Sequence, residues 1–155
     1  FYQPTMKAIL YFFSAALVLS SCSNQTKEPA PSPLAGTWKM ISAITIKGKD
    51  TTVADYTTGK EFIKIITPSH FSFLSHDLNR GQDSTASFVA GGGRVKLGEG
   101  KYTEYLDYCN FRGWEGGVFE LNYTINGDTL TTSSVEKIEK LGIDQLNMEK
   151  LVKVR

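Results

Sequence analysis

Apolar and polar residues alternate along short segments of the chain, and closely spaced turn signals separate these segments from about position 34 onward. The clearest case is the segment 118–135, where apolar residues alternate with polar ones before an Asn126-Gly127 pair. A period of two is typical of a strand with one buried face, and Asn-Gly favours a tight hairpin turn. The segment therefore predicts a β-hairpin. Its inward-facing residues are expected to be Phe119, Leu121, Tyr123 and Ile125.

Other segments carry the same strand signals. The segments 61–67 and 70–75 flank a Pro-Ser pair and predict a second hairpin. The segments 101–108 and 148–155 predict two more strands, the second of which closes the chain. These runs are rich in Thr, Ile, Val, Phe and Tyr, which favours an all-β fold.

One short helix is predicted before the last strand, because Val135, Ile138 and Leu141 recur at helical spacing ahead of Gly142. The remaining pattern predicts an antiparallel, up-and-down meander of about eight to ten strands. A meander of this length must hide its edge strands, and closure into a barrel does so.

The start of the chain has a different pattern. Met6-Lys7 precedes an uncharged, mostly apolar stretch from Ala8 to Leu19, and two serines then lead to Cys22. This is the layout of a secretory signal peptide, and the stretch is too short for a transmembrane helix of about 20 residues. The ending Leu-Ser-Ser-Cys resembles the lipobox of bacterial lipoproteins, whose Cys is acylated and becomes the first mature residue.

Three parts of the chain follow from this layout. Residues 1–21 are interpreted as an upstream extension plus a lipoprotein signal peptide. Residues 22–33 comprise the lipidation site Cys22 and a polar tether with three prolines, which cannot bury apolar surface. Residues 34–155 form the folded domain. The resemblance implies a lipoprotein of the bacterial cell envelope, anchored through acylated Cys22 in the outer membrane.

Composition excludes several classes of function. The chain has 17 Lys and Arg and 16 Asp and Glu residues, and one of the lysines, Lys7, lies in the signal segment. The mature protein is thus near neutral, and nucleic-acid binding is not expected. Of the two cysteines, acylation of Cys22 would leave Cys109 alone. An intramolecular disulfide and a multi-cysteine zinc site are therefore excluded.

The folded domain opens with a second family resemblance. Gly36-Thr37-Trp38 heads the first predicted strand and resembles the Gly-x-Trp signature of the lipocalins and the wider calycin superfamily. In that superfamily the Trp packs across the base of the barrel, often under a basic residue of the last strand. The resemblance implies a lipocalin-like barrel whose base holds Gly36 and Trp38 with Lys153 and Arg155.

Two more features are similar to small bacterial lipocalin-like lipoproteins. A Gly-rich loop at 91–93 leads into a Tyr-Thr-Glu strand at 102–104, and Gly-Asp-Thr-Leu occurs at 127–130. The second lipocalin motif, Thr-Asp-Tyr, is missing from its expected late position, and the similar residues at 54–56 lie too early. The match implies architecture more strongly than any ligand.

Strand alternation indicates which side chains face the interior of such a barrel. If Trp38 faces inward, the later inward positions of its strand are Met40, Ser42, Ile44 and Ile46. A barrel of eight or more strands holds either its own side chains alone or one small ligand. The predicted ligand-binding residues are Met40, Phe73, Tyr102, Glu104, Tyr108, Leu121 and Tyr123.

Glu104 is the polar member of this set. A buried carboxylate must be paired or hydrogen-bonded. The candidate partners are Arg80, Arg94, Arg112, His70, His76 and the tyrosine hydroxyls. One interpretation makes Glu104 the polar anchor for a ligand with a hydrophobic body and one hydrogen-bonding end. The other makes it a structural ion pair or a solvated side chain.

No catalytic or metal-binding pattern accompanies this set. His70 and His76 have no third histidine and a weak ligand spacing, and Cys109 is interpreted as a small buried hydrophobe. We expect no enzyme activity, metal or cofactor. Two functions remain open: an envelope protein that binds a small, partly apolar ligand, and a tethered structural or interaction module with a filled barrel. An interior cavity of about 300 Å³ or more would favour the first.

Overall fold

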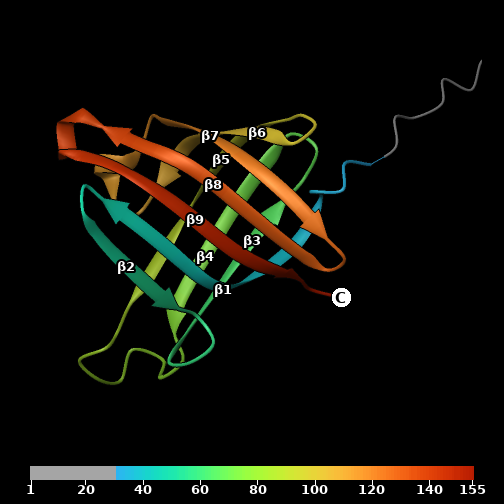
Figure 1. Ribbon diagram of the computed structural model, residues 1–155. Coiled ribbons are helices and arrows are strands. Elements are labelled where there is room, and N and C mark those ends of the chain that lie inside the picture. Colours follow the sequence, from blue (N-terminus) through green and yellow to red (C-terminus); the bar gives the residue numbers. More distant parts are fainter. Residues whose placement is uncertain (1–30) are drawn as a thin grey trace, which may run out of the picture.

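The computed structural model describes residues 31–155, which form one antiparallel β-sheet that closes on itself (Figure 1). The strands are β1 (Gly36–Lys47), β2 (Asp50–Asp55), β3 (Lys60–Ile66), β4 (His70–Asp77), β5 (Phe88–Leu97), β6 (Lys101–Cys109), β7 (Gly117–Asn126), β8 (Thr129–Ile138) and β9 (Ile143–Lys153). Two 3₁₀ turns, η1 (Arg112–Trp114) and η2 (Glu139–Leu141), follow β6 and β8. Within the described residues, no helix has the length and apolar character needed to cross a membrane. The predicted signal peptide and Cys22 lie outside these residues.

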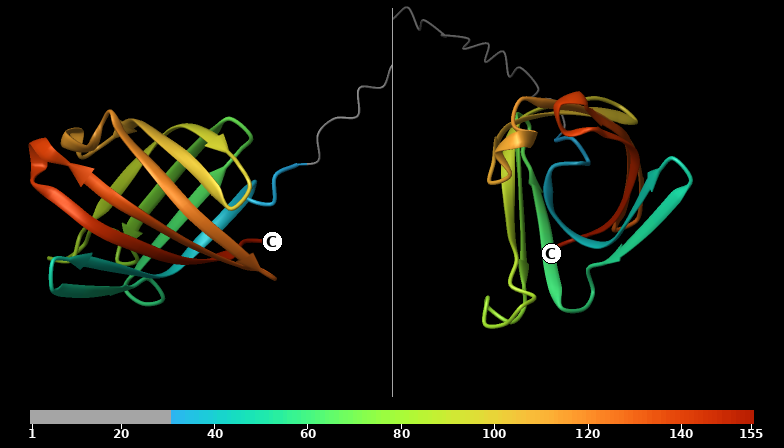
Figure 2. Two further views of the ribbon diagram at one scale, coloured as in Figure 1. Left: turned by 45° about the horizontal axis from the view of Figure 1, so that its top comes forward. Right: turned by 90° about the vertical axis from the view of Figure 1, so that its left-hand side faces the viewer.

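Strand β1 closes the barrel because both of its edges are paired. One edge pairs with β9 from Trp38 to Ile46. On the other edge, residues 36–39 pair with β3 and residues 42–47 pair with β2. Eight strands thus form the barrel, and β2 lies outside it, as the end-on view in Figure 2 shows. The predicted all-β, antiparallel barrel is confirmed.

Both predicted hairpins are present. Strands β3 and β4 pair along their lengths, as do β7 and β8 from Leu121 to Asn126. The β7–β8 loop consists of Gly127 and Asp128, because Asn126 already pairs with Thr129. Gly127 has φ +58°, a left-handed conformation that glycine adopts without steric cost. The turn therefore starts one residue later than the Asn-Gly pair predicts.

The predicted short helix is instead the end of β8 followed by the turn η2. Val135 and Ile138 both lie in β8, which pairs with β9 as far as Ile138 opposite Ile143. Ile138 is buried and Val135 is exposed, because residues three apart face opposite sides of a strand. The backbone of this segment forms its hydrogen bonds with β9. The spacing of Val135, Ile138 and Leu141 therefore does not correspond to a helix.

The glycines at 91–93 lie inside β5 rather than in a loop, contrary to expectation. A Cβ atom at Gly91 would lie 2.5 Å from the Phe73 ring, and one at Gly93 would lie 2.0 Å from the Tyr105 carbonyl oxygen. Close approach of neighbouring chain segments requires these glycines. Their function is therefore packing, not flexibility.

A β-bulge in β1 changes which of its residues face inward. The register with β9 shifts between Met40 and Ser42, and the extra residue turns the following positions to the other face. Ala43 and Thr45 consequently oppose Glu149 and Asn147 of β9, which line the interior. The expectation that Ser42, Ile44 and Ile46 face inward is therefore wrong, because the bulge turns these residues to the opposite face of β1.

Trp38 lies fully buried at one end of the barrel. Its indole Nε1 donates a hydrogen bond to the Leu34 carbonyl at 2.8 Å. The Lys153 ammonium lies 4.9 Å from the indole centroid and donates to the carbonyl of Ala35. Lys153 pairs opposite Trp38 in the sheet. Arg155 follows the end of β9, is exposed and contacts Asp128 instead, so its predicted position beside the Trp is wrong.

Candidate functional site

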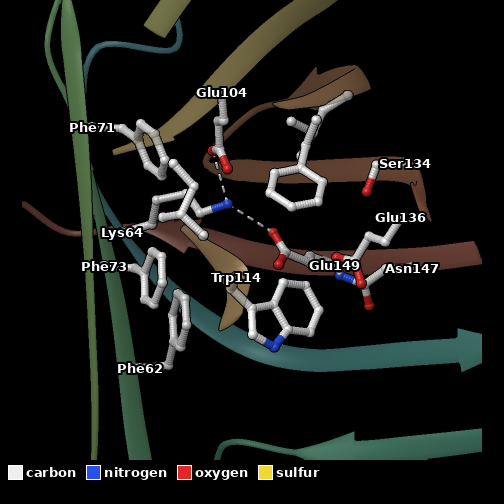
Figure 3. Close-up of a pocket in the computed structure, with 13 residues that line it drawn as sticks. Phe62, Lys64, Phe71, Phe73, Glu104, Trp114, Ser134, Glu136, Asn147 and Glu149 are labelled. Atoms are coloured by element: carbon white, nitrogen blue, oxygen red, sulfur yellow. Dashed lines mark hydrogen bonds and ion pairs between the residues drawn. The ribbon is translucent and has the colours of Figure 1, made fainter. Parts of the chain in front are cut away.

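The barrel interior contains a cavity of about 140 Å³. One part of its wall is aromatic, and another carries buried charges (Figure 3). The lining residues are Phe62, Lys64, Phe71, Phe73, Glu104, Leu106, Trp114, Phe119, Leu121, Ser134, Glu136, Asn147 and Glu149. They come from β3, β4, β6, β7, β8, β9 and the turn η1, so only closure of the barrel brings them together.

The aromatic wall is packed by ring contacts. Phe62 of β3 and Phe73 of β4 stack with ring centroids 5.8 Å apart and planes within 6°. Trp114 of η1 packs on Phe119 of β7 at 6.1 Å. The Phe73 ring has room because Gly91 of β5 carries no side chain. Aromatic faces carry partial negative charge and attract cations as well as apolar groups.

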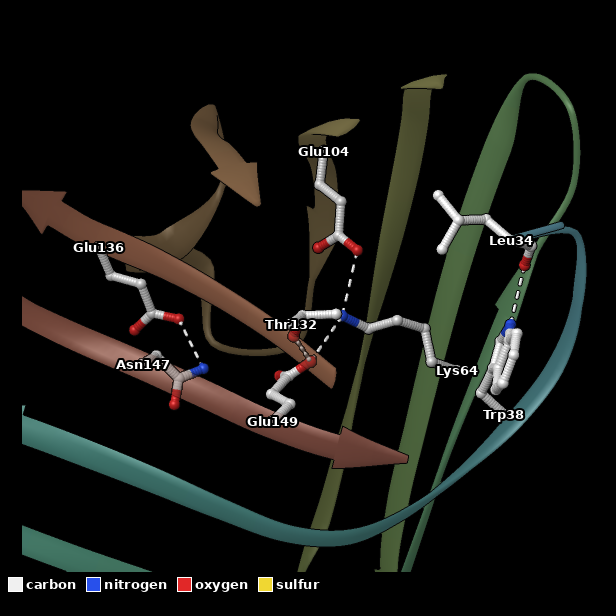
Figure 4. Close-up of polar contacts among 8 residues, drawn as sticks. All are labelled: Leu34, Trp38, Lys64, Glu104, Thr132, Glu136, Asn147 and Glu149. Carbon is white, nitrogen blue, oxygen red and sulfur yellow. Dashed lines mark hydrogen bonds and ion pairs between the residues drawn. The ribbon is translucent and has the colours of Figure 1, made fainter. Parts of the chain in front are cut away.

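A buried ion cluster forms the second part of the wall (Figure 4). The Lys64 ammonium of β3 lies 3.1 Å from Glu104 Oε1 of β6 and 3.2 Å from Glu149 Oε2 of β9. The Thr132 hydroxyl donates to Glu149 Oε2 at 3.3 Å. Lys64 is 3 % exposed and Glu104 is 7 % exposed. Charged side chains buried this deeply are stable only when they are paired. The ion pairs therefore connect β3, β6 and β9 across the barrel interior.

Glu136 of β8 is a third carboxylate in the lining. It accepts hydrogen bonds from the side-chain amides of Gln145 at 2.8 Å and Asn147 at 3.1 Å. Both donors are neutral, and within residues 31–155 no Lys or Arg forms an ion pair with Glu136. The lining therefore holds three carboxylates and one ammonium.

The pKa directions follow from this arrangement. Burial raises the pKa of Glu104, and the attraction of Lys64 offsets this effect only in part. Burial also raises the pKa of Glu136. For Lys64, burial lowers the pKa, but Glu104 and Glu149 outweigh burial and hold the pKa well above its ordinary value. Lys64 is therefore positively charged. One ammonium does not compensate the negative charge of the three carboxylates, which keeps the pKa values of Glu104 and Glu136 raised.

Two buried polar atoms of the described residues accept or donate no hydrogen bond. They are the Tyr102 hydroxyl and Glu104 Oε1, the latter having only its ion pair with Lys64. Tyr102 is 1 % exposed. Burial raises the pKa of its hydroxyl well above the ordinary value, and the nearby Lys64 ammonium offsets this only in part. Unsatisfied buried polar groups carry a free-energy cost that a bound polar group would relieve.

A more open apolar groove of about 320 Å³ adjoins the cavity. Phe73, Leu106 and Trp114 line both spaces. The rest of the groove is formed by Val89, Cys109 and Phe111. Phe73, Leu106 and Trp114 thus lie between the cavity, which contains the charged residues, and the apolar groove.

The structure places the predicted ligand-binding residues in different environments. Phe73, Glu104 and Leu121 line the cavity. Met40 and Tyr102 are buried beside it but do not line it. Tyr123 packs against the core and donates its hydroxyl proton to the Gly98 carbonyl.

Tyr108 is a clear correction, because it is 73 % exposed. The alternation of Tyr102, Glu104 and Leu106 holds, with all three buried. A register shift then occurs where Gly92 pairs with Tyr108 and Gly93 with Leu106, leaving Asp107 as an extra residue. This bulge turns Tyr108 outward.

Sequence reasoning missed the main charged partner in the site. The histidines and arginines proposed for Glu104 are exposed, and Arg94 forms a bidentate pair with Asp107. The actual partner, Lys64, alternates with Phe62 and Ile66 in β3, a pattern that places it on the inward face. Glu136 and Glu149 carry a weaker signal, because each has an apolar residue on only one side along the same face: Ile138 follows Glu136, and Leu151 follows Glu149.

The remaining candidate residues do not join this site. His70 and His76 are exposed, and Cys109 is buried within the core cluster. Within residues 31–155, no group of three or more His, Cys, Asp or Glu side chains is arranged to hold a metal ion.

Comparison with models of protein families finds no match, and no curated protein matches the chain significantly. The functional argument therefore depends on the geometry of the interior and on the sequence.

Proposed function

We propose that this chain is a lipid-anchored protein of the bacterial envelope that binds a small, partly apolar ligand inside its barrel. The observation that carries the proposal is the interior cavity, which has an aromatic wall on one side and buried charges on another. Ligand sites are commonly concave and apolar, with a few convergent polar groups that fix orientation.

The anchoring half of the proposal depends on the sequence alone. Leu19 to Cys22 has the residues expected of a lipobox, and the polar segment 23–33 would separate the barrel from a membrane surface. Tethering to the outer membrane would concentrate the barrel where small molecules enter the cell.

Cavity size restricts the ligand. The interior space of about 140 Å³ is smaller than the roughly 300 Å³ expected to favour a ligand over a filled barrel, so a ligand would have to be small. At about 30 Å³ per water molecule, it corresponds to about five waters. A single ring with a short polar arm would fit, and a longer apolar part could extend into the adjoining groove.

Native mass spectrometry on the protein purified from its own host tests the binding function. We expect a stoichiometric small molecule that survives gentle ionisation and is released on denaturation. A mass equal to the bare acylated chain under all growth conditions would contradict the proposal.

A second candidate is a tethered structural or interaction module without a ligand. It is favoured by the same small volume and by the Lys64 cluster, which fills part of the interior with the chain's own side chains. In that case, ligand screens would leave the amide resonances of the lining residues unchanged.

The proposal is for a binding protein rather than an enzyme. Covalent catalysis needs a nucleophile with a positioned base. Cys109 packs in the core cluster, and Lys64, Glu104 and Glu149 pair with one another.

A further inference from the structure

The charge of the cavity wall is unbalanced. Lys64 faces Glu104 and Glu149, while Glu136 contacts only neutral amides. With all four groups ionised, the wall has a formal charge of −2, from three carboxylates and one ammonium. Uncompensated charge in a desolvated space is unfavourable, so an incoming positive charge would be stabilised and an incoming anion repelled.

The groups around the cavity favour an organic cation over a metal ion. Phe62, Phe73 and Trp114 line the cavity together with Glu136 and Asn147. Aromatic faces stabilise desolvated cations, and they also pack against an apolar group. Metal ions instead require several converging oxygen or nitrogen ligands, which the described residues do not provide.

A separate observation points to a missing polar contact. Glu104 Oε1 faces the cavity with the Lys64 ammonium, 3.1 Å away, as its polar contact. The neighbouring Tyr102 hydroxyl has no hydrogen-bond partner within the described residues. Figure 3 shows the Glu104 carboxylate pointing into the space toward Lys64. A ligand with N–H donors would satisfy acceptors of this kind, whereas a carboxylate ligand would not.

We propose that the ligand is a small organic cation of the protonated-amine class. Its charged end lies among Glu104, Glu136 and Glu149, and its apolar part contacts Phe62, Phe73 and Trp114. This inference rests on the proposed binding function and adds the charge of the ligand to it.

Three probes of one shape test the inference: benzylamine, benzyl alcohol and benzoate. Each is titrated into the ¹⁵N-labelled full-length protein at pH 7. The Trp114 indole signal reports on the cavity, and the Trp38 indole signal reports on the barrel base. Because a charge-assisted hydrogen bond contributes about 1.5–3 kcal/mol, we expect benzylamine to bind at least about tenfold more tightly than benzyl alcohol. Benzoate should bind least.

A matched pair of variants locates the charge effect. Glu136→Gln keeps the shape of the side chain and should weaken benzylamine by about tenfold while leaving benzyl alcohol unchanged. Glu104→Gln is a second variant with the same expected direction. Glu120→Gln, on the exposed outer side of β7, should change neither affinity.

The outcomes separate the two proposals. Binding of benzyl alcohol or benzoate as tight as that of benzylamine would overturn the cation inference and leave the binding function intact. Failure of all three probes to shift the Trp114 signal would overturn both proposals and favour the filled barrel.

Discussion

Lys64 is the residue on which the interior depends most. It is the one cation among the lining residues and pairs with carboxylates from two other strands. Replacing such a residue leaves two buried negative charges without compensation, which costs more than the pair itself contributes. Lys64 is paired opposite Trp38 in the sheet, so the barrel base and the ion cluster are adjacent.

Lys64→Met should therefore lower the free energy of unfolding by roughly 3–5 kcal/mol. Urea denaturation measures the change. The control is Lys101→Met, which removes an exposed pair with Glu120 and should cost less than about 1 kcal/mol. Equal, small losses in the two variants would contradict the described cluster.

Glu136 gives a pH-dependent prediction. Because burial raises its pKa, the folded state holds the proton more tightly than the unfolded chain between the ordinary and the raised pKa. Stability from this group therefore falls as pH rises through that window. Glu136→Gln cannot ionise, so its melting temperature should exceed that of the wild type at pH 7 but not at pH 4.

The same melting series has an internal comparison. Glu104 has a raised pKa as well, so some loss of stability with rising pH should remain in the Glu136→Gln variant. A variant less stable than the wild type at pH 7 would mean that ionised Glu136 stabilises the fold.

Trp38 closes the barrel base and is fully buried. Trp38→Ala should cost roughly 3–5 kcal/mol, as a large-to-small change in a packed core. Trp114→Ala is the comparison, since Trp114 is only partly buried and should lose less. Guanidinium denaturation distinguishes them, and a loss at Trp38 no larger than that at Trp114 would contradict its role in the core.

At the scale of elements, β5 determines how close its neighbours approach. Gly91→Ala places a methyl group where the Phe73 ring now lies, and overpacking of this kind costs about 1–3 kcal/mol. We expect this loss together with shifted aromatic proton resonances of Phe73. Lys96→Ala, on the exposed side of the same strand, should leave those resonances in place.

Two bulges decide the inner surface of β1 and β6. A strict period of two predicts Tyr108 inside with Leu106, but the extra residue Asp107 turns Tyr108 outward. Bulges depend on the pairing of two strands. A single strand's sequence therefore places residues correctly only as far as the first register shift.

At the scale of the whole molecule, the position of the barrel in the cell is a prediction from the sequence. Cys22→Ser should block acylation and signal processing, so the protein would retain its leader or lose its stable membrane attachment. Membrane fractionation with mass spectrometry of the N-terminus measures both effects. Recovery of the variant as a mature, membrane-bound form would contradict lipidation at Cys22.

Closure of the sheet is the event that creates the candidate site. Lys64, Glu104 and Glu149 lie on β3, β6 and β9, far apart in the sequence, and meet because β1 pairs with β9 on one edge and β3 on the other. The ion cluster depends on that closure. Mutations that weaken the β1–β9 pairing should therefore affect stability and binding together.

The sequence by itself determined the class of fold, an antiparallel β-barrel, but not the position of β2 outside the barrel. Alternation and turn residues are local properties with a period of two, so the hairpins β3–β4 and β7–β8 and the inward set Tyr102, Glu104 and Leu106 could be predicted. The prediction of lipidation at Cys22 likewise depends only on a local motif.

Only the tertiary structure decided the composition of the interior. The partner of Glu104 is Lys64, from a strand not adjacent to β6, and the outward position of Tyr108 follows from pairing with β5. Contacts between distant segments set the register and the closure of the sheet. Because side chains alternate between the two faces of a strand, a one-residue shift in register moves them to the opposite face. That is why the barrel could be predicted from the sequence while its charge balance could not.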